Sequence, residues 1–482
     1  MSLEPSRGTC MIGHAYGGSL HVWNLEGANQ AVEQPEMPTD ERVSYLYWKA
    51  TPCVTGHFGG VVDLCWESSS GMYLLTASED QTCRLWAPTQ STISKEPVWV
   101  EVARPQVHGY NLAAITSLSC SKHPHFLVSG ADEKELRSFH ATHLTLRTLE
   151  NVTGEKLSDG DVMERVERAY IPSLGLSNKA SAADGAEEDT PDESANNQNR
   201  SQVKLPLERD LGVASLWPEA NKLFGHKTEL YCLTSTLESH DSSSGDPSDI
   251  LVASSCKARD EEAAAIRLWN AFEGKSHQVL TGGHKSTVAT LAFSPDSSLL
   301  ASSGKDRRLC LWQKQEDGQY ALAWAKDSAH KRIVWSIHFL PWGDRRVLAS
   351  GSRDGSIKIW NVTSTKDGVE AAIMFNFAPV HKVGGKADSV TALSFCPAPM
   401  ADGTTALLAV GLESGRLELW SIPLDERDQA PALNLALPAN VSHKATVTKL
   451  SWRSMKAHET ANIFTLASCS MDNGCRLFSV KA

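Results

Sequence analysis

The stretch HKSTVATLAFSPDSSLLASSGKDRRLCLW, residues 284–312, decides the fold. It begins with a histidine, continues through an apolar segment and a segment rich in small residues, turns at Asp306 and ends at Trp312. Residues 57–86 and 330–360 follow the same plan. In all three copies an aspartate precedes the closing tryptophan by six positions. Such repetition predicts an array of similar supersecondary units.

Four weaker copies bring the number of units to seven. Apolar and polar residues alternate within the units, and turn residues recur every 8–12 positions or so, which predicts an all-β architecture. A period of roughly 40–45 residues is typical of four-stranded propeller blades. The weaker copies are His108–Phe139 with Asp132 in the turn, His226–Trp269 with loop insertions, a copy ending at Trp420 with Lys386 in the histidine position and Ser414 in the aspartate position, and His443–Phe478 with Asp472.

The pattern resembles the WD40 family, in which His, Ser or Thr, Asp and Trp form a hydrogen-bonded tetrad within a blade. The resemblance implies that these polar groups satisfy one another and stiffen the turn, since a buried polar group without a partner is costly. The implied tetrads are His57, Thr76, Asp80 and Trp86; His284, Ser302, Asp306 and Trp312; His330, Ser350, Asp354 and Trp360; and His443, Ser468 and Asp472 with Phe478 in the tryptophan position.

The segment before the first histidine predicts how the ring closes. An open sheet edge invites aggregation, and in WD40 folds the N-terminus supplies the outer strand of the last blade. Val43–Val54 has the pattern of that strand, so we expect one seven-bladed propeller over residues 43–480. Within residues 1–42, Gly17–Asn24 resembles the third strand and closing Trp of an earlier blade whose first two strands are absent. We therefore expect a remnant of an upstream propeller and a linker.

Residues 140–210 interrupt the repeats between the second and third units. The segment from Ala180 to Arg200 contains six carboxylates, one arginine and no aromatic residue. Such a composition does not bury enough surface to fold, so we expect disorder over residues 180–203. The apolar flanks, residues 171–180 and 214–226, are expected to pack on the ring.

Composition restricts the class of protein. The 482 residues carry a net charge of -11, which disfavours general binding to phosphate backbones. The eleven cysteines are scattered without metal-site spacing and are expected to be small buried hydrophobes in a reducing compartment. No apolar signal core or membrane-length segment is present in the sequence. We therefore expect a protein of the cytoplasm and nucleus.

Several stretches outside the repeat positions resemble the second propeller of the Elongator complex protein 2 family. They are residues 101–112, 129–139, 172–180, 216–226 and 254–270. The resemblance implies a scaffold subunit that bridges the catalytic acetyltransferase subunit and the large scaffold subunit of Elongator, in support of C5 modification of the tRNA wobble uridine (U34). Members of that family carry two propellers, whereas this sequence has one and a remnant strand.

Catalysis and nucleic-acid binding are the alternatives to scaffolding. A hydrolase triad occurs once and lies in a cleft, whereas these His, Ser and Asp residues recur in turns, so we predict no enzyme. The sequence has no phosphate loop or cofactor motif, and we expect no cofactor and no metal. Basic residues near the fourth and fifth histidines predict a basic patch that binds an acidic partner or RNA phosphate. Binding to RNA would make the chain an RNA-binding module. The alternative is that these residues form a solvated rim. They are Lys285, Lys305, Arg307, Lys331, Arg332 and Arg353.

Overall fold

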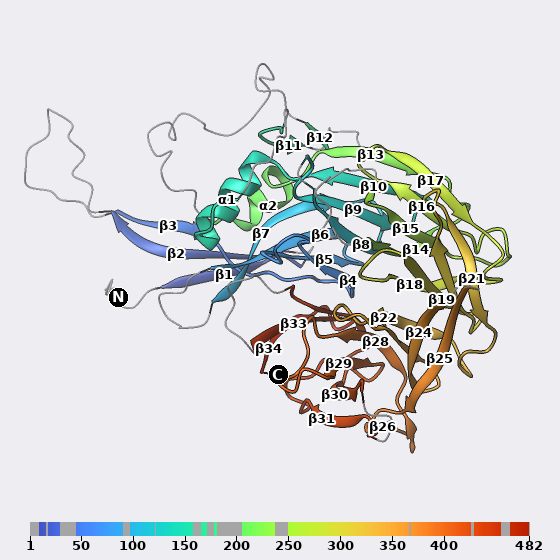
Figure 1. Cartoon of the computed structure of the whole chain (residues 1–482). Helices are drawn as coiled ribbons and strands as arrows, with labels where there is room; N and C mark the ends of the chain where they lie inside the picture. The colour runs from blue at the N-terminus through green and yellow to red at the C-terminus, as the bar shows by residue number, and fades with distance from the viewer. Residues whose placement is uncertain are drawn as a thin grey trace, which may run out of the picture.

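Antiparallel sheets arranged in a ring dominate the structure, which is a computed structural model of the chain (Figure 1). Its strands are built from alternating sequences: in β24 (Ile357–Thr365), Ile357 and Ile359 are fully buried, whereas Lys358 between them is partly exposed. The predicted all-β WD40 fold is confirmed. The structure describes residues 9–15, 18–28, 45–89, 97–120, 122–157, 165–170, 178–180, 205–236, 249–365, 368–425, 429–454 and 463–481.

Seven sheets form the blades, numbered here in chain order. Six have four strands, and the described part of blade 7 has three. Blade 1 comprises β4 (Val61–Trp66), β5 (Leu74–Ser78), β6 (Thr82–Thr89) and β7 (Val98–Val107); blade 2 comprises β8 (Leu112–Leu118), β9 (Phe126–Ala131), β10 (Glu135–His140) and β13 (Glu219–Phe224); blade 3 comprises β14 (Leu230–Ser235), β15 (Val252–Cys256), β16 (Ile266–Asn270) and β17 (Lys275–Leu280); blade 4 comprises β18 (Val288–Phe293), β19 (Leu299–Gly304), β20 (Leu309–Lys314) and β21 (Tyr320–Lys326). Blade 5 comprises β22 (Val334–Phe339), β23 (Arg346–Ser352), β24 and β25 (Gly368–Phe377); blade 6 comprises β28 (Val390–Phe395), β29 (Thr405–Leu412), β30 (Leu417–Pro423) and β31 (Ala432–Ala436); blade 7 comprises β32 (Val447–Trp452), β33 (Ile463–Ser470) and β34 (Cys475–Lys481).

The innermost strands close the ring. β4, β8, β14, β18, β22, β28 and β32 contact one another in that order, and β32 contacts β4. Hydrogen bonds join blades 7 and 1: Thr448 Oγ1 donates to Val61 O at 2.6 Å, and Trp66 Nε1 donates to Ser451 O at 3.1 Å. Buried apolar side chains fill each of the seven seams between neighbouring blades. The ring is therefore shut by packing and by direct bonds, and among the described residues no strand is exchanged between blades 7 and 1.

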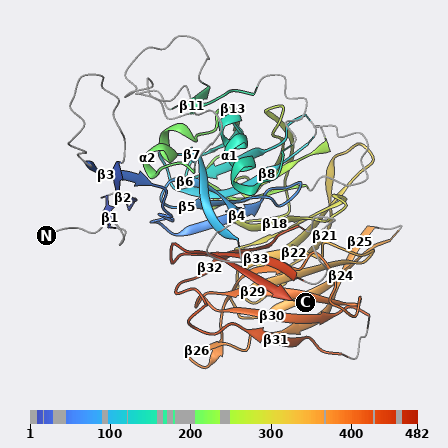
Figure 2. The same ribbon diagram turned by 90° about the vertical axis from the view of Figure 1, so that its left-hand side faces the viewer.

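The N-terminal segment forms a separate three-stranded sheet of β1 (Cys10–His14), β2 (Leu20–Ala28) and β3 (Tyr45–Thr51), which projects from the side of the ring (Figure 2). The prediction that Val43–Val54 is the outer strand of the last blade was wrong, because β3 pairs with β2. The expectation that both strands preceding Gly17–Asn24 are absent was also wrong, because β1 pairs with β2. By its pattern, an alternating strand fits the edge of the N-terminal sheet as well as the edge of blade 7, and only the three-dimensional arrangement selects its partner.

The insertion lies within blade 2, between β10 and β13, and it covers blade 1. It contains α1 (His143–Thr153), a short hairpin of β11 (Ala169–Tyr170) and β12 (Lys179–Ala180), and α2 (Glu208–Ala214). Both helices contact β7 (Figure 1). The fully buried Trp217 packs in the core that α1 shares with blade 1, and the segment after it forms β13. Of residues 180–203, where disorder was predicted, Ala180 ends β12 and the others lie outside the described residues.

Candidate functional site: blade tetrads, a buried ion network and a basic surface

The blade 1 tetrad is a directed chain of hydrogen bonds. Trp86 Nε1 donates to Thr76 Oγ1 at 2.9 Å, Thr76 Oγ1 lies 2.7 Å from His57 Nε2, and His57 Nδ1 lies 2.8 Å from Asp80 Oδ2. An indole only donates and a carboxylate only accepts, so the threonine hydroxyl donates to Nε2, and Nδ1–H donates to the aspartate. The tetrad thereby joins β5 and β6, the turn between them and the loop that precedes β4.

The structure also brings together the other sequence-predicted tetrads, with one variation. In blade 4, His284 lies 2.8 Å from Ser302 and 3.0 Å from Asp306. In blade 5, Ser356 lies between the partners: its hydroxyl is 2.8 Å from His330 Nδ1 and donates to Asp354 at 2.5 Å. The remaining contacts are Trp312 to Ser302 (2.9 Å), His330 to Ser350 (2.7 Å), Trp360 to Ser350 (2.8 Å), His443 to Ser468 (2.8 Å) and His443 to Asp472 (3.0 Å).

Two positions in the weaker units were assigned wrongly. In blade 2, His108 bonds Glu133 at 2.9 Å, whereas Asp132 pairs with Lys257 of the next blade. In blade 6, the histidine facing Ser414 is His381, at 3.4 Å.

The displaced residue in blade 6 is Lys386, which is exposed on β27 (Lys386–Ala387). That strand forms a small hairpin with β26 (Lys382–Val383), and the hairpin separates the blade histidine from its strand. The dipeptide His381–Lys382 repeats the His-Lys of four other blades and was the available signal. Asp388 also contacts His381, at 3.3 Å.

Protonation states follow from burial. Burial lowers the pKa of His57, His330 and His443, and the neighbouring aspartates only partly offset it, so these imidazoles are neutral near pH 7. Burial raises the pKa of Asp306 and Asp472, but hydrogen bonds from histidine and backbone N–H groups outweigh it, and both pKa values lie below the usual range. Neutral histidine beside ionised aspartate suits a structural bond that persists across physiological pH.

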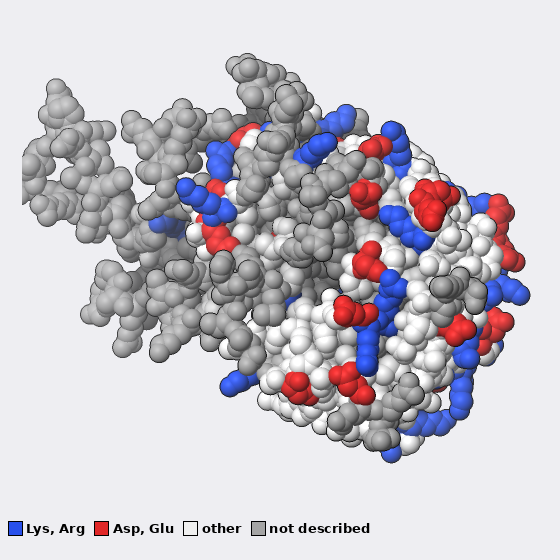
Figure 3. All heavy atoms as spheres, in the orientation of Figure 1, with Lys and Arg blue, Asp and Glu red and all other residues white. Residues whose placement is uncertain are grey.

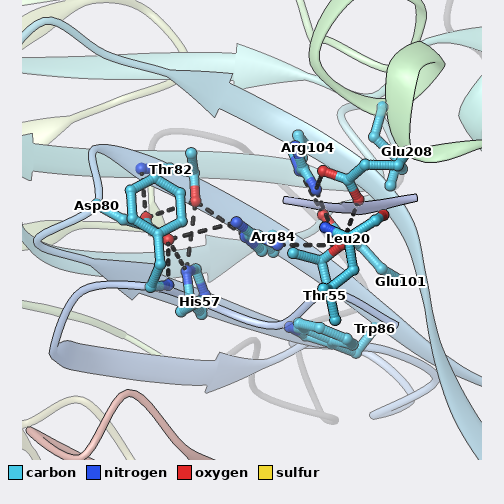
Figure 4. Close-up of polar contacts among 12 residues, drawn as sticks. Leu20, Thr55, His57, Asp80, Thr82, Arg84, Trp86, Glu101, Arg104 and Glu208 are labelled. Atoms are coloured by element: carbon cyan, nitrogen blue, oxygen red, sulfur yellow. Dashed lines mark hydrogen bonds and ion pairs between the residues drawn. The ribbon is translucent and has the colours of Figure 1, made fainter. Parts of the chain in front are cut away.

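A buried chain of charged side chains extends from the blade 1 tetrad to the insertion (Figure 4). Arg84 is 1% exposed and contacts both Asp80, at 3.4 Å, and Glu101, at 3.1 Å. Glu101 accepts from Arg104 Nε at 2.7 Å, and Arg104 Nη2 donates to Glu208 of α2 at 2.7 Å. Opposite charges alternate along the chain, which offsets the cost of removing each from water. The repeat pattern did not predict this network; charged residues within otherwise apolar strands were its only signal.

The six predicted basic residues are exposed on blades 4 and 5. The backbone N–H groups of Lys285 and Lys331 donate to Asp306 and Asp354 at 3.1 and 2.8 Å, so these lysines lie directly beside the tetrads. Within the described part of the chain, none of the six side chains forms an ion pair. On the face seen in Figure 3, acidic and basic side chains are interspersed, as expected for a chain whose charges are spread over many blades.

No helix in the described ranges is both long and apolar enough to cross a membrane. Among those same residues, no three or more His, Cys, Asp or Glu side chains are grouped so that they could hold a metal ion. None of the eleven cysteines, all of which the structure describes, is joined in a disulfide.

Comparison with known proteins defines the class first. The model of the WD domain, G-beta repeat, matches residues 48–87, 274–313 and 325–361. These ranges include the three units with complete tetrads. The chain is therefore a WD40-repeat protein.

Longer relatives extend the similarity beyond the repeats. Elongator complex protein 2 of Homo sapiens is 32% identical over 98% of this chain and 57% of the human protein. The Drosophila melanogaster and Arabidopsis thaliana proteins are 33% and 31% identical over 98% of this chain and 56% and 55% of their own lengths. The chain is a homologue of Elongator complex protein 2, which confirms the predicted resemblance. It spans about half the length of the curated relatives it matches.

Proposed function

We propose that this chain is a non-catalytic scaffold subunit of an Elongator assembly. In this role it supports C5 modification of the tRNA wobble uridine by holding the catalytic acetyltransferase subunit and the large scaffold subunit in position. The observation that carries the proposal is similarity to Elongator complex protein 2 along 98% of the chain, far beyond the repeat positions that any WD40 protein shares. Such a role places the protein in the cytoplasm and nucleus.

The use of the polar side chains supports a role without catalysis. The His–Asp pairs are distributed around the ring, and each closes on a serine or threonine of its own blade. A histidine that acts as a general base needs a free ring nitrogen that faces the substrate. In the tetrads both imidazole nitrogens are bonded within the blade, so the histidines hold sheets together.

The test is affinity purification of the full chain from its own cells, followed by mass spectrometry, together with nucleoside analysis of tRNA after its depletion. The proposal predicts copurification of an acetyltransferase subunit and loss of C5-modified wobble uridine. Normal levels of that nucleoside after depletion would refute it. Restoration of the nucleoside by re-expression is the control for indirect effects.

Direct tRNA binding is the second candidate, and the exposed cations of blades 4 and 5 favour it. Reversing Lys331, Arg332 and Arg353 to glutamate removes three of the six exposed positive charges on this surface. If RNA phosphates bind here, the variant loses affinity for tRNA, and the loss shrinks as salt rises. If instead a protein partner binds here, copurification falls while the mobility shift of tRNA stays unchanged. Unchanged results in both assays reject the patch.

A further inference from the structure

Glu208 joins three segments that are far apart in the sequence (Figure 4). It opens α2 in the insertion and is 6% exposed. One carboxylate oxygen accepts from Arg104 Nη2 on the outer strand of blade 1, and the other accepts from Thr55 Oγ1, both at 2.7 Å. Thr55 Oγ1 in turn accepts from the backbone N–H of Leu20, at 3.2 Å. One side chain therefore connects the insertion, the ring and β2 of the N-terminal sheet.

The N-terminal sheet meets this junction at the first residue of β2. Cys53 Sγ donates to Leu20 O at 2.9 Å, so both backbone polar groups of Leu20 are bonded to the segment that leads into blade 1. Nearby, Gly18 adopts φ +85° and lies so close to Phe58 that an added Cβ would be 2.6 Å from its side chain. Among the described residues, the sheet therefore contacts the segment leading into blade 1 through the two bonds at Leu20 and the close approach of Gly18 to Phe58.

Glu208 itself is held firmly from the insertion side. Ser215, just after α2, accepts from the backbone N–H of Arg104 at 2.8 Å. Pro105 O accepts from Trp217 N and from Asn178 Nδ2, both at 3.0 Å. Four of these residues, Arg104, Pro105, Asn178 and Trp217, belong to stretches that distinguish the chain from WD40 repeats in general, residues 101–112, 172–180 and 216–226. Three of the stretches outside the repeat thus meet around β7.

We propose that Glu208 is a positioning residue that fixes the N-terminal sheet to the ring, so that the insertion controls where this sheet points. A carboxylate suits this role because it accepts two strong, directional bonds at once, and the bond from the guanidinium of Arg104 orients it. The insertion then acts as a strut between blade 1 and the N-terminal sheet. This role is independent of the proposed function in tRNA modification.

The reactivity of Cys53 reports on this junction in the full chain. Its thiol is partly buried and bonded to Leu20, whereas Cys10 is exposed and serves as an internal reference. Alkylation by iodoacetamide is followed at each cysteine by peptide mass spectrometry. In Glu208→Ala and in Thr55→Val, Cys53 is expected to react about tenfold faster than in the native chain, the factor that corresponds to about 1.4 kcal/mol, while the rate at Cys10 stays the same.

The two variants separate opening of the junction from a change in thiol acidity. Burial raises the pKa of Cys53, the hydroxyl of Thr55 lowers it, and the charge of Glu208 raises it. Removing the Thr55 hydroxyl therefore makes the thiol less acidic, which by itself slows alkylation. Faster alkylation in Thr55→Val thus requires that the junction opens.

A matched control is Glu219→Gln. Glu219 is the first residue of β13, where the chain re-enters blade 2 after the insertion, and it accepts from Arg137 at 3.0 Å. Its loss is expected to leave the reactivity of Cys53 unchanged. Acceleration in both Glu208→Ala and Thr55→Val but not in Glu219→Gln supports the proposal. An unchanged rate in Thr55→Val, or equal acceleration in Glu219→Gln, overturns it. Circular dichroism of each variant verifies that the ring is folded.

Discussion

The role of the tetrad tryptophan is tested by comparing Ser302→Ala in blade 4 with Ser468→Ala in blade 7. Both serines are fully buried, and both lie 2.8 Å from the Nε2 of a blade histidine. Ser302 also accepts from the indole of Trp312 at 2.9 Å, whereas blade 7 has Phe478 in the tryptophan position. The same chemical change therefore strands two polar groups in blade 4 and one in blade 7.

The magnitudes follow from the number of stranded groups. A buried donor or acceptor without a partner costs about 1–3 kcal/mol. Ser302→Ala leaves His284 Nε2 and the indole N–H of Trp312 without their partner, so its free energy of unfolding should fall by about 2–6 kcal/mol. Ser468→Ala leaves only His443 Nε2 without its partner, so its free energy of unfolding should fall by about 1–3 kcal/mol. Both changes remove a single oxygen, so the cavity contribution is small and similar.

Urea denaturation followed by tryptophan fluorescence measures the two losses, and hydrogen exchange of the amides in β19 and β33 assigns each loss to its blade. The double variant should show additive losses, because the two blades share no partner. Equal losses in the two single variants would refute the assignment of Trp312 to the tetrad. A larger loss in Ser468→Ala would refute the hydrogen-bond reasoning as a whole.

Three further predictions concern buried charge. Burial, and then a neighbouring cation, lowers the pKa of His226 to about 3 and that of His338 to about 4. As the pH falls, these histidines bind protons in the unfolded chain before they do so in the folded chain. The urea midpoint should therefore stay constant above pH 6.5 and fall as the pH drops from 6.5 toward 4. Glu101→Ala leaves buried arginines without their shared carboxylate and should lower the free energy of unfolding by about 3–5 kcal/mol. Glu133→Gln should lower the urea midpoint, whereas Asp132→Asn should leave it nearly unchanged, because only Glu133 bonds the blade histidine. A larger fall of the midpoint in Asp132→Asn than in Glu133→Gln would contradict the geometry.

Repetition made the ring predictable. The spacing of histidine, small polar residue, aspartate and tryptophan recurs because each blade solves the same local problem, which is to satisfy polar groups in its own turn. Local hydrogen bonds within about 30 residues leave a periodic trace in the sequence, as in residues 284–312. Seven units, and the identity of the strongest tetrads, were therefore visible without coordinates.

Interactions between distant segments were less predictable. The partner of β3 was misassigned because an alternating strand fits the edge of β2 or of β34 equally well by pattern alone. His381 was missed because a hairpin changed its spacing from the following strand. Arg104 and Glu208 are about a hundred positions apart, and no periodicity relates them.

The sequence by itself determined that the chain folds into a ring of blades and that its His–Asp pairs are structural, because both properties arise from contacts within a repeat. Only the tertiary structure decided where the N-terminal sheet lies, how the insertion crosses blade 1, and which carboxylate links them. Those choices depend on which edges and charges remain unpaired after the ring has closed. A linear pattern does not carry that information, since it records the side chains but not the distances between segments once the chain has folded.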